Sequence, residues 1–187
     1  MKNRYYEIAD GILQEIETVI HQVDPQETER LVQEILKAEK VFLFAVGRVF
    51  LSLQCFGKRL SHLGIDCQVV GSITEKPADN QDLLIIASGS GESKLPLEIA
   101  RIAKSKGTRL ALITSARVSS IKAMSDIAIH LPCPTKNDPH AGVPSQQPMS
   151  SLFDQSLHVF GDIIAIMLQQ EKGLKTEDLW RYHANLE

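Results

Sequence analysis

Short, almost uninterrupted apolar runs alternate with longer amphipathic segments through the middle of the chain, and this alternation constrains the fold most. Five runs have the length and composition of strands and lie at 41–46, 67–70, 83–87, 109–114 and 126–131. The segments with helical spacing between them lie at 49–63, 94–106 and 118–124. Strands of this kind, separated by helices, are typical of a parallel sheet covered on both faces. We therefore expect an α/β fold, a three-layer α/β/α sandwich with a five-stranded parallel sheet.

Helical patterns flank this core at both ends of the chain. Two precede it, at 3–21 and 25–38, and a long apolar stripe followed by a short last helix comes after it. The segment 132–148 holds five of the eight prolines, which predicts a long surface loop. We expect a single domain over 1–187, made of N-terminal helices (1–38), an α/β core (41–131), the proline-rich loop (132–148) and C-terminal helices (149–187).

Charge and cysteine content narrow the classes of partner. The net charge of −3 leaves nothing to attract nucleic acid or an anionic membrane. No apolar run approaches the roughly 18 residues of a membrane span, and acids interrupt the N-terminal segment where a signal peptide would be apolar. The three cysteines stand far apart, without disulfide or metal-ligand spacing. We expect a soluble, cytoplasmic protein that binds neither nucleic acid nor membrane.

A cluster of serine and glycine, SGSGES at 88–93, directly follows the apolar run at 83–87. At the carboxyl end of a parallel strand, glycines let backbone N–H groups converge on a ligand, and the next helix adds its positive dipole end. With the serine hydroxyls, this combination suits a phosphate monoester. Nucleotide sites are disfavoured, because the segment matches neither the P-loop spacing nor GxGxxG. The alternative is an ordinary strand-to-helix turn with Ser93 as the helix cap.

A second loop, AVGRV at 45–49, follows the first predicted strand. Gly47 allows a close backbone approach, and Arg48 could reach an anion or pair with a carboxylate of a neighbouring subunit. Because loops at the carboxyl ends of parallel strands meet at one edge of the sheet, this loop and the serine loop are expected to border one crevice. The alternative for Arg48 is a solvated residue at the start of a helix.

Four motifs together resemble a known family: VFLFAVGR with KRLSHLG, the SGSGES loop, QPMSSLFDQ at 147–155, and the terminal HANLE. In this order they are similar to the sugar isomerase (SIS) domain, specifically the 6-phospho-3-hexuloisomerases. The resemblance implies a flavodoxin-like fold and a homotetramer with active sites near subunit boundaries. It also implies reversible conversion of D-arabino-hex-3-ulose 6-phosphate to fructose 6-phosphate, with no metal or organic cofactor.

The resemblance assigns roles to individual residues. Those expected to bind the phosphate are Ser88, Gly89, Ser90, Gly91 and Ser93, and those expected to line the crevice are Gly47, Arg48 and Ser72. Asp154 is the candidate acid/base, because a buried carboxylate can carry a proton between neighbouring carbons. His183 is the candidate assisting group at the sugar oxygens. No histidine has the spacing of a metal ligand, so no metal is assigned.

Both catalytic candidates have a simpler structural alternative. Asp154 could be an acid favoured by the helix dipole or an i,i+4 partner of His158, and His183 could simply be exposed near the C-terminus. The chain also departs from the family at three crevice positions, with Val49 for serine and with Ser72 and Asp154 for glutamate. A catalytically weak module that binds or senses sugar phosphates therefore remains an alternative. A flavin-binding, flavodoxin-like protein would share the architecture, and a DNA-binding regulator is disfavoured because no basic recognition element is present.

Overall fold

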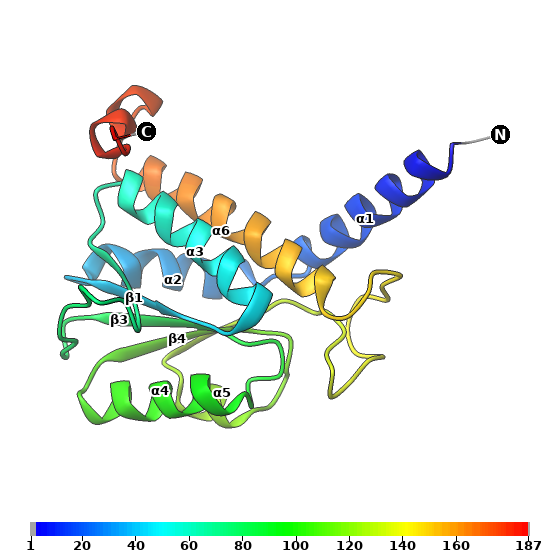
Figure 1. The fold of residues 1–187 in the computed structure, drawn as a ribbon, viewed down its shortest axis with the longest axis horizontal. Coiled ribbons are helices and arrows are strands. Elements are labelled where there is room, and N and C mark those ends of the chain that lie inside the picture. Colours follow the sequence, from blue (N-terminus) through cyan, green and yellow to red (C-terminus); the bar gives the residue numbers. More distant parts are fainter. Residues whose placement is uncertain (1–2, 187) are drawn as a thin grey trace.

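A five-stranded parallel sheet forms the middle layer of the computed structural model, which describes residues 3–186 (Figure 1). The strands are β1 (Val41–Phe44), β2 (Cys67–Val69), β3 (Leu83–Ala87), β4 (Arg109–Thr114) and β5 (Ile127–His130). They pair in the order β2-β1-β3-β4-β5, and every pair is parallel. The predicted sheet is confirmed, although β1 ends two residues before the apolar run does. The chain there turns into a helix at Gly47, whose φ is +62°.

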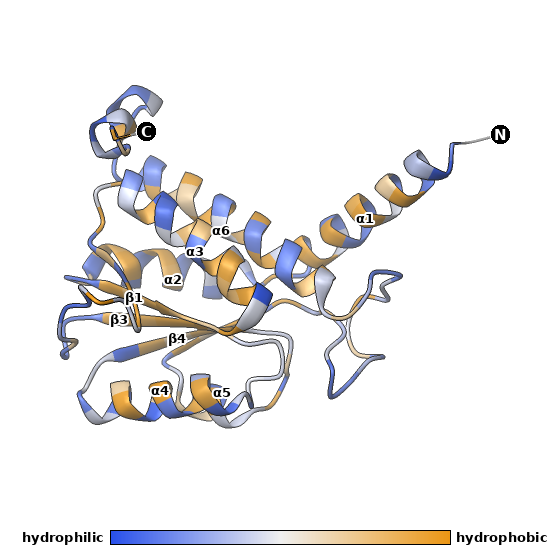
Figure 2. Cartoon of the chain, in the orientation of Figure 1, coloured by the Kyte–Doolittle hydropathy of each residue, from blue (hydrophilic) through white to orange (hydrophobic). Residues whose placement is uncertain are grey.

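Helices cover both faces of the sheet and confirm the three-layer prediction. The elements are α1 (Arg4–Ile20), α2 (Pro25–Lys37), α3 (Gly47–His62), α4 (Lys94–Ser105), α5 (Ser120–Met124), α6 (Ser151–Glu171) and a 3-10 helix, η1 (Thr176–Tyr182). The larger core lies where α2, α3 and α6 pack on one face, and a smaller core lies under α4 and α5 on the other (Figures 1 and 2). The N-terminal half of α1 projects away from both layers (Figure 1).

Helix α6 is a core helix that packs closely on α3. A Cβ atom on Gly161 would lie 2.9 Å from the Cβ of Phe56, so this glycine lets the two helices approach. By length and composition alone α6 could cross a membrane, but 61% of its most apolar window is buried within the protein. Its apolarity is explained by contacts with α3, α1 and α2.

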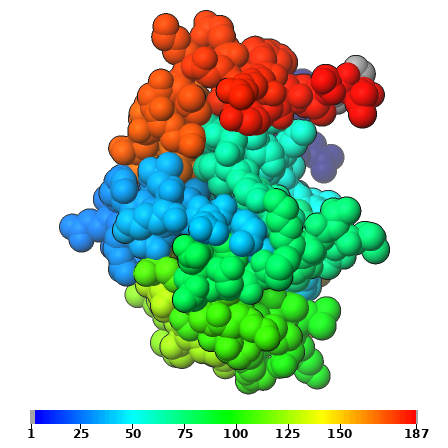
Figure 3. Space-filling view, turned by 90° about the vertical axis from the view of Figure 1, so that its left-hand side faces the viewer, coloured from blue at the N-terminus to red at the C-terminus, as the bar shows by residue number. Residues whose placement is uncertain are grey.

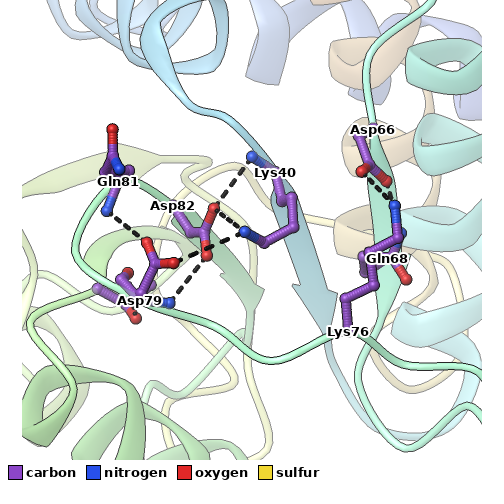
Figure 4. A network of polar contacts seen from close by, with 8 residues as sticks. Lys40, Asp66, Gln68, Lys76, Asp79, Gln81 and Asp82 are labelled. Atoms are coloured by element: carbon purple, nitrogen blue, oxygen red, sulfur yellow. Dashed lines mark hydrogen bonds and ion pairs between the residues drawn. The ribbon is translucent and has the colours of Figure 1, made fainter.

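A buried carboxylate fastens the amino end of the sheet (Figure 4). Asp82, which is 1% exposed, precedes β3 and accepts hydrogen bonds from the backbone N–H groups of Lys40 and Asp79, at 3.1 and 2.8 Å. The ammonium of Lys40 lies 3.1 Å from the same carboxylate. The two Lys40 contacts join the start of β1 to the start of β3, and the Asp79 contact closes the turn before β3. This end of the sheet is therefore held through a buried carboxylate.

We expect Asp82→Asn to lower the free energy of unfolding by about 1–3 kcal/mol, because an amide cannot accept all of the hydrogen bonds that the carboxylate accepts. The matched control is Asp66→Asn, which breaks the pair between Asp66 and Lys76 in Figure 4, whose side chains are 36% and 54% exposed. Such an exposed pair contributes under about 1 kcal/mol. Urea unfolding of both variants measures the difference, and equal losses would contradict the role given to Asp82.

Candidate functional site

The serine loop, residues 88–93, lies at the carboxyl end of β3 and leads into α4. It is a tight turn: the backbone N–H of Gly91 donates to the hydroxyl of Ser88 at 3.1 Å, and the N–H of Ser88 donates to the carbonyl of Ile113 at 3.0 Å. Gly91 has a φ of +62°, and a Cβ atom there would lie 2.2 Å from the Oγ of Ser119. Only glycine fits this position, which explains part of the glycine content of the loop.

The N-terminus of α4 lacks a side-chain cap. Ser93 occupies the N-cap position, but its hydroxyl makes no capping hydrogen bond and instead lies 3.4 Å from the Oγ of Ser88. The first turn of α4 contains no acid either. Ser93 therefore takes the N-cap position of the alternative expectation, but its side chain does not cap the helix. Backbone N–H groups with no internal partner are left at the end of the helix that attracts anions.

A pocket of about 380 Å³ opens beside this loop. It lies between the serine loop, the proline-rich loop and the start of α6, and its lining residues are Val49, Gly89, Ser90, Glu92, Ser93, Lys94, Pro134, Thr135, Lys136, Asn137, Ser150 and Phe153. The two strand-end loops thus meet at one crevice through Gly89 and Val49. Of the predicted phosphate-binding residues, Gly89, Ser90 and Ser93 are in this lining, and Ser88 and Gly91 are outside it. The predicted crevice residues Gly47, Arg48 and Ser72 are also outside it. Ser72 is exposed in the loop after β2.

Asp154 is buried in the first turn of α6, next to the pocket-lining Phe153. Its side chain is 4% exposed, and the Oδ2 atom lies 3.2 Å from the Nε of Arg48, at the start of α3. The Nη1 of Arg48 also donates to the Oγ of Ser151, at 3.4 Å. The Oδ1 atom has no hydrogen-bond partner among the described residues. Burial raises the pKa of Asp154 and the nearby Arg48 opposes that rise.

This environment favours an acid/base role. A carboxyl group with a raised pKa and one oxygen able to accept a proton is typical of catalytic sites. Of the simpler alternatives for Asp154, the i,i+4 pairing with His158 is not found, because His158 lies 3.8 Å from Asp162 instead. The other is met, since Asp154 does lie in the first turn of α6, where the helix dipole favours an acid.

His183 lies at the opposite end of the molecule from Asp154. Its ring stacks on that of His62, at the end of α3, with centroids 5.1 Å apart, and it also contacts Trp180. Figure 3 shows the C-terminal segment, in red, covering this end of α3. Helix α6 has 21 residues and separates the two ends by about 30 Å. One chain therefore does not bring its own His183 to Asp154.

Sequence reasoning missed the part of the pocket that the proline-rich loop supplies. Thr135, Lys136 and Asn137 face the serine loop across the pocket, and Lys94 joins them from α4. The available signal was the position of that loop, directly after the last strand and directly before Asp154. Over residues 3–186, no group of three His, Cys, Asp or Glu side chains could hold a metal ion.

Comparison with known proteins shows the family of this chain. The SIS domain model matches residues 34–159, which is more than half of the chain. The chain belongs to the SIS domain family. Within this family, the Bacillus subtilis 3-hexulose-6-phosphate isomerase is 36% identical to this SIS protein over 97% of the chain and 98% of the relative. The Mycobacterium gastri 3-hexulose-6-phosphate isomerase is 33% identical over 92% of the chain and 86% of the relative.

Solved structures give the same result for the fold. A Methanococcus jannaschii protein, described as having an inferred molecular function of 3-hexulose-6-phosphate isomerase, superposes with a TM-score of 0.84 at 26% identity. That match covers 97% of this SIS protein and 99% of the other chain. The predicted SIS fold is confirmed over almost the whole length.

Proposed function

We propose that this SIS protein is a sugar-phosphate isomerase that interconverts D-arabino-hex-3-ulose 6-phosphate and fructose 6-phosphate. The observation that carries the proposal is the buried, partly unpaired carboxylate of Asp154, which directly follows the pocket-lining Phe153 in the chain. The N-terminus of α4, which follows the serine loop and has no side-chain cap, supports phosphate binding in the same pocket. The near full-length likeness to the Bacillus subtilis 3-hexulose-6-phosphate isomerase supports the choice of substrate.

The serine loop binds the phosphate, and Asp154 carries the proton. Hydroxyl groups and backbone N–H groups at residues 88–93 offer donors to the phosphate oxygens, and the α4 dipole favours its charge. Asp154 removes the proton from C2 of the 3-ulose while O3 gains a proton, which gives an enediol shared between C2 and C3; the proton that O2 loses in the next step balances the one gained by O3. Return of the proton to C3, with loss of the O2 proton, leaves the carbonyl at C2 of fructose 6-phosphate. One carboxylate serves both steps because its pKa is raised toward the working pH.

A second copy of the chain completes the site in this proposal. Since His183 lies far from Asp154 in its own chain, it can assist at the sugar oxygens only if a neighbouring subunit presents it. We therefore propose a homotetramer with sites at the subunit boundaries. A cytoplasmic location fits the three free cysteines, Cys55, Cys67 and Cys133.

Isotope exchange tests the function directly. Fructose 6-phosphate incubated with the protein in heavy water should gain deuterium at C3, which mass spectrometry and proton NMR detect. No deuterium in the carbon skeleton at high protein concentration would exclude this isomerase activity. If calorimetry detects binding of sugar phosphates but no deuterium is exchanged, the protein is instead a module that binds or senses sugar phosphates.

The pH dependence of exchange should respond to Arg48. The carboxylate of Asp154 must be ionised to accept a proton, so kcat/KM rises with pH through the pKa of Asp154. Arg48 opposes the rise of this pKa, so Arg48→Gln should move the acid limb of the kcat/KM profile to higher pH. The control is Arg59→Gln, on the same helix as Arg48, which removes an exposed ion pair with Asp162 of α6. An unmoved or acid-shifted limb in Arg48→Gln would contradict the assignment of Asp154 as the base.

A further inference from the structure

The proposed phosphate site contains an excess of cationic side chains that no described residue neutralises. The charged residues of the pocket lining are Glu92, Lys94 and Lys136. The Oε1 atom of Glu92 accepts a hydrogen bond from the backbone N–H of Ser120 at 2.6 Å, so this acid is engaged with the start of α5. The ammonium group of neither lysine forms a hydrogen bond or an ion pair with any residue in 3–186. By contrast, the lysines that pair with an aspartate elsewhere are Lys40, Lys76 and Lys104.

Lys136 is held in place by its loop. Thr135 and Asp138 exchange backbone hydrogen bonds at 2.9 and 3.2 Å, and the N–H of Asp138 also donates to the Oγ1 of Thr135 at 3.0 Å. Lys136 therefore lies at the tip of a closed turn. The base of the loop is fixed as well, because the N–H of Val143 donates to the carbonyl of Pro132 at 2.8 Å.

The serine loop alone cannot neutralise a phosphate ester. Its donors are hydroxyl and backbone N–H groups, which are neutral, whereas a phosphate monoester carries about −1.5 to −2 charges at neutral pH. Arg48, at the start of α3, is already paired with Asp154. The counter-charge in the pocket must therefore come from Lys94, which begins α4, and from Lys136, which faces the loop from the proline-rich segment. A lysine at a helix N-terminus opposes the dipole, and a bound anion would relieve that repulsion.

We propose that Lys136 binds the phosphate group of the substrate across the pocket from the serine loop, and so determines specificity for phosphorylated sugars. The inference rests on the proposed function and adds a second binding wall to it. The proline-rich loop, shown in yellow in Figure 1 at the carboxyl end of the sheet, then acts as a fixed clamp. The ammonium would contribute charge-assisted hydrogen bonds that the serine loop does not provide.

Calorimetric titration with fructose 6-phosphate, inorganic phosphate and fructose tests this role. Lys136→Ala should weaken binding of fructose 6-phosphate and of inorganic phosphate by about tenfold or more, since each loses a charge-assisted hydrogen bond, and should leave the response to fructose unchanged. Lys136→Arg, which keeps the charge, should lose less affinity than Lys136→Ala. The matched control is Lys58→Ala, which removes an exposed lysine of α3 outside the pocket. This control should change the affinity by less than about twofold.

The two proposals fail in different ways. If Lys136→Ala and Lys58→Ala bind both phosphates as tightly as the wild-type chain while the wild type exchanges deuterium, the role of Lys136 is overturned and the isomerase assignment stands. If the wild type binds phosphate through Lys136 without any exchange, the clamp stands and the isomerase assignment fails. In an active enzyme the Lys136→Ala loss should fall on KM more than on kcat, and a loss confined to kcat would overturn the clamp.

Discussion

Asp154→Asn should reduce the rate of deuterium exchange into fructose 6-phosphate by about 10²–10⁴-fold, the usual contribution of a general acid/base. The amide keeps the size of the side chain in its buried position, but it cannot accept and return a proton. Exchange rates at saturating fructose 6-phosphate measure the loss. The matched control is Asp162→Asn, which changes an exposed aspartate on the same helix and should leave exchange unaffected.

Stability separates this catalytic effect from misfolding. Because burial raises the pKa of Asp154, the folded chain holds the proton of this group more tightly than the unfolded chain does. The contribution of Asp154 to stability is therefore present below the pKa of the unfolded state and is lost as the pH rises through the folded pKa. At neutral pH, Asp154→Asn should leave the free energy of unfolding equal or higher. An inactive variant that is also strongly destabilised would contradict this account, as would a fully active one.

Gly91→Ala should remove phosphate binding and destabilise the fold. A left-handed backbone costs a residue with a Cβ about 1–2 kcal/mol. The new methyl group would also overlap Ser119, since its Cβ would lie 2.2 Å from the Oγ atom. Such overpacking typically costs about 1–3 kcal/mol. The serine loop must shift to make room for the methyl group, so its backbone N–H groups no longer point at one ligand position. The affinity for fructose 6-phosphate should therefore fall by more than about tenfold.

Gly173→Ala is the matched control for that substitution. Gly173 has nearly the same φ, +60°, but apart from its two neighbours in the chain no described residue comes within 4 Å of the position that a Cβ would take. Gly173→Ala should therefore lose only the stability that the backbone strain costs, and it should bind fructose 6-phosphate as the wild type does. Thermal unfolding and calorimetry on both variants give the comparison. Normal phosphate affinity in Gly91→Ala would show that the serine loop is not the phosphate site.

The strands and helices could be predicted because their signals are local. The apolar run at 83–87 is fully buried in β3, and the helical pattern at 25–38 forms α2, which begins at Pro25 with Asp24 as its N-cap. The end of β1 was less predictable. Ala45 and Val46 continue the apolar run, but the strand pairing ends before them, at Phe44. The 3-10 geometry of the last helix likewise depends on tertiary contacts with α3, which no pattern in 176–182 reveals.

The site was predictable only where one segment carries it. The serine loop is a continuous motif whose residues do line the pocket, in part, as expected. Lys136 could not be foreseen, because its relation to Ser90 is created by a turn more than forty residues further along the chain. His183 lies at the far end of α6 because of the length and direction of that helix. A short motif at the end of the chain contains no information about either.

Two buried aspartates, one at each end of the sheet, differ in how far their oxygens are satisfied. Asp82 and Asp154 are 1% and 3% exposed, yet the first has partners for both oxygens and the second has one oxygen without any among residues 3–186. Tolerance to mutation should follow this difference. A change near Asp154 can remove the free-energy cost of a buried oxygen without a hydrogen bond, whereas a change near Asp82 leaves buried polar groups without their partner. Substitutions at the end of the sheet near Asp154 can then change the substrate preference, while the contacts of Asp82 at the other end keep the chain able to fold. A combinatorial library restricted to the pocket should accordingly yield mostly folded proteins.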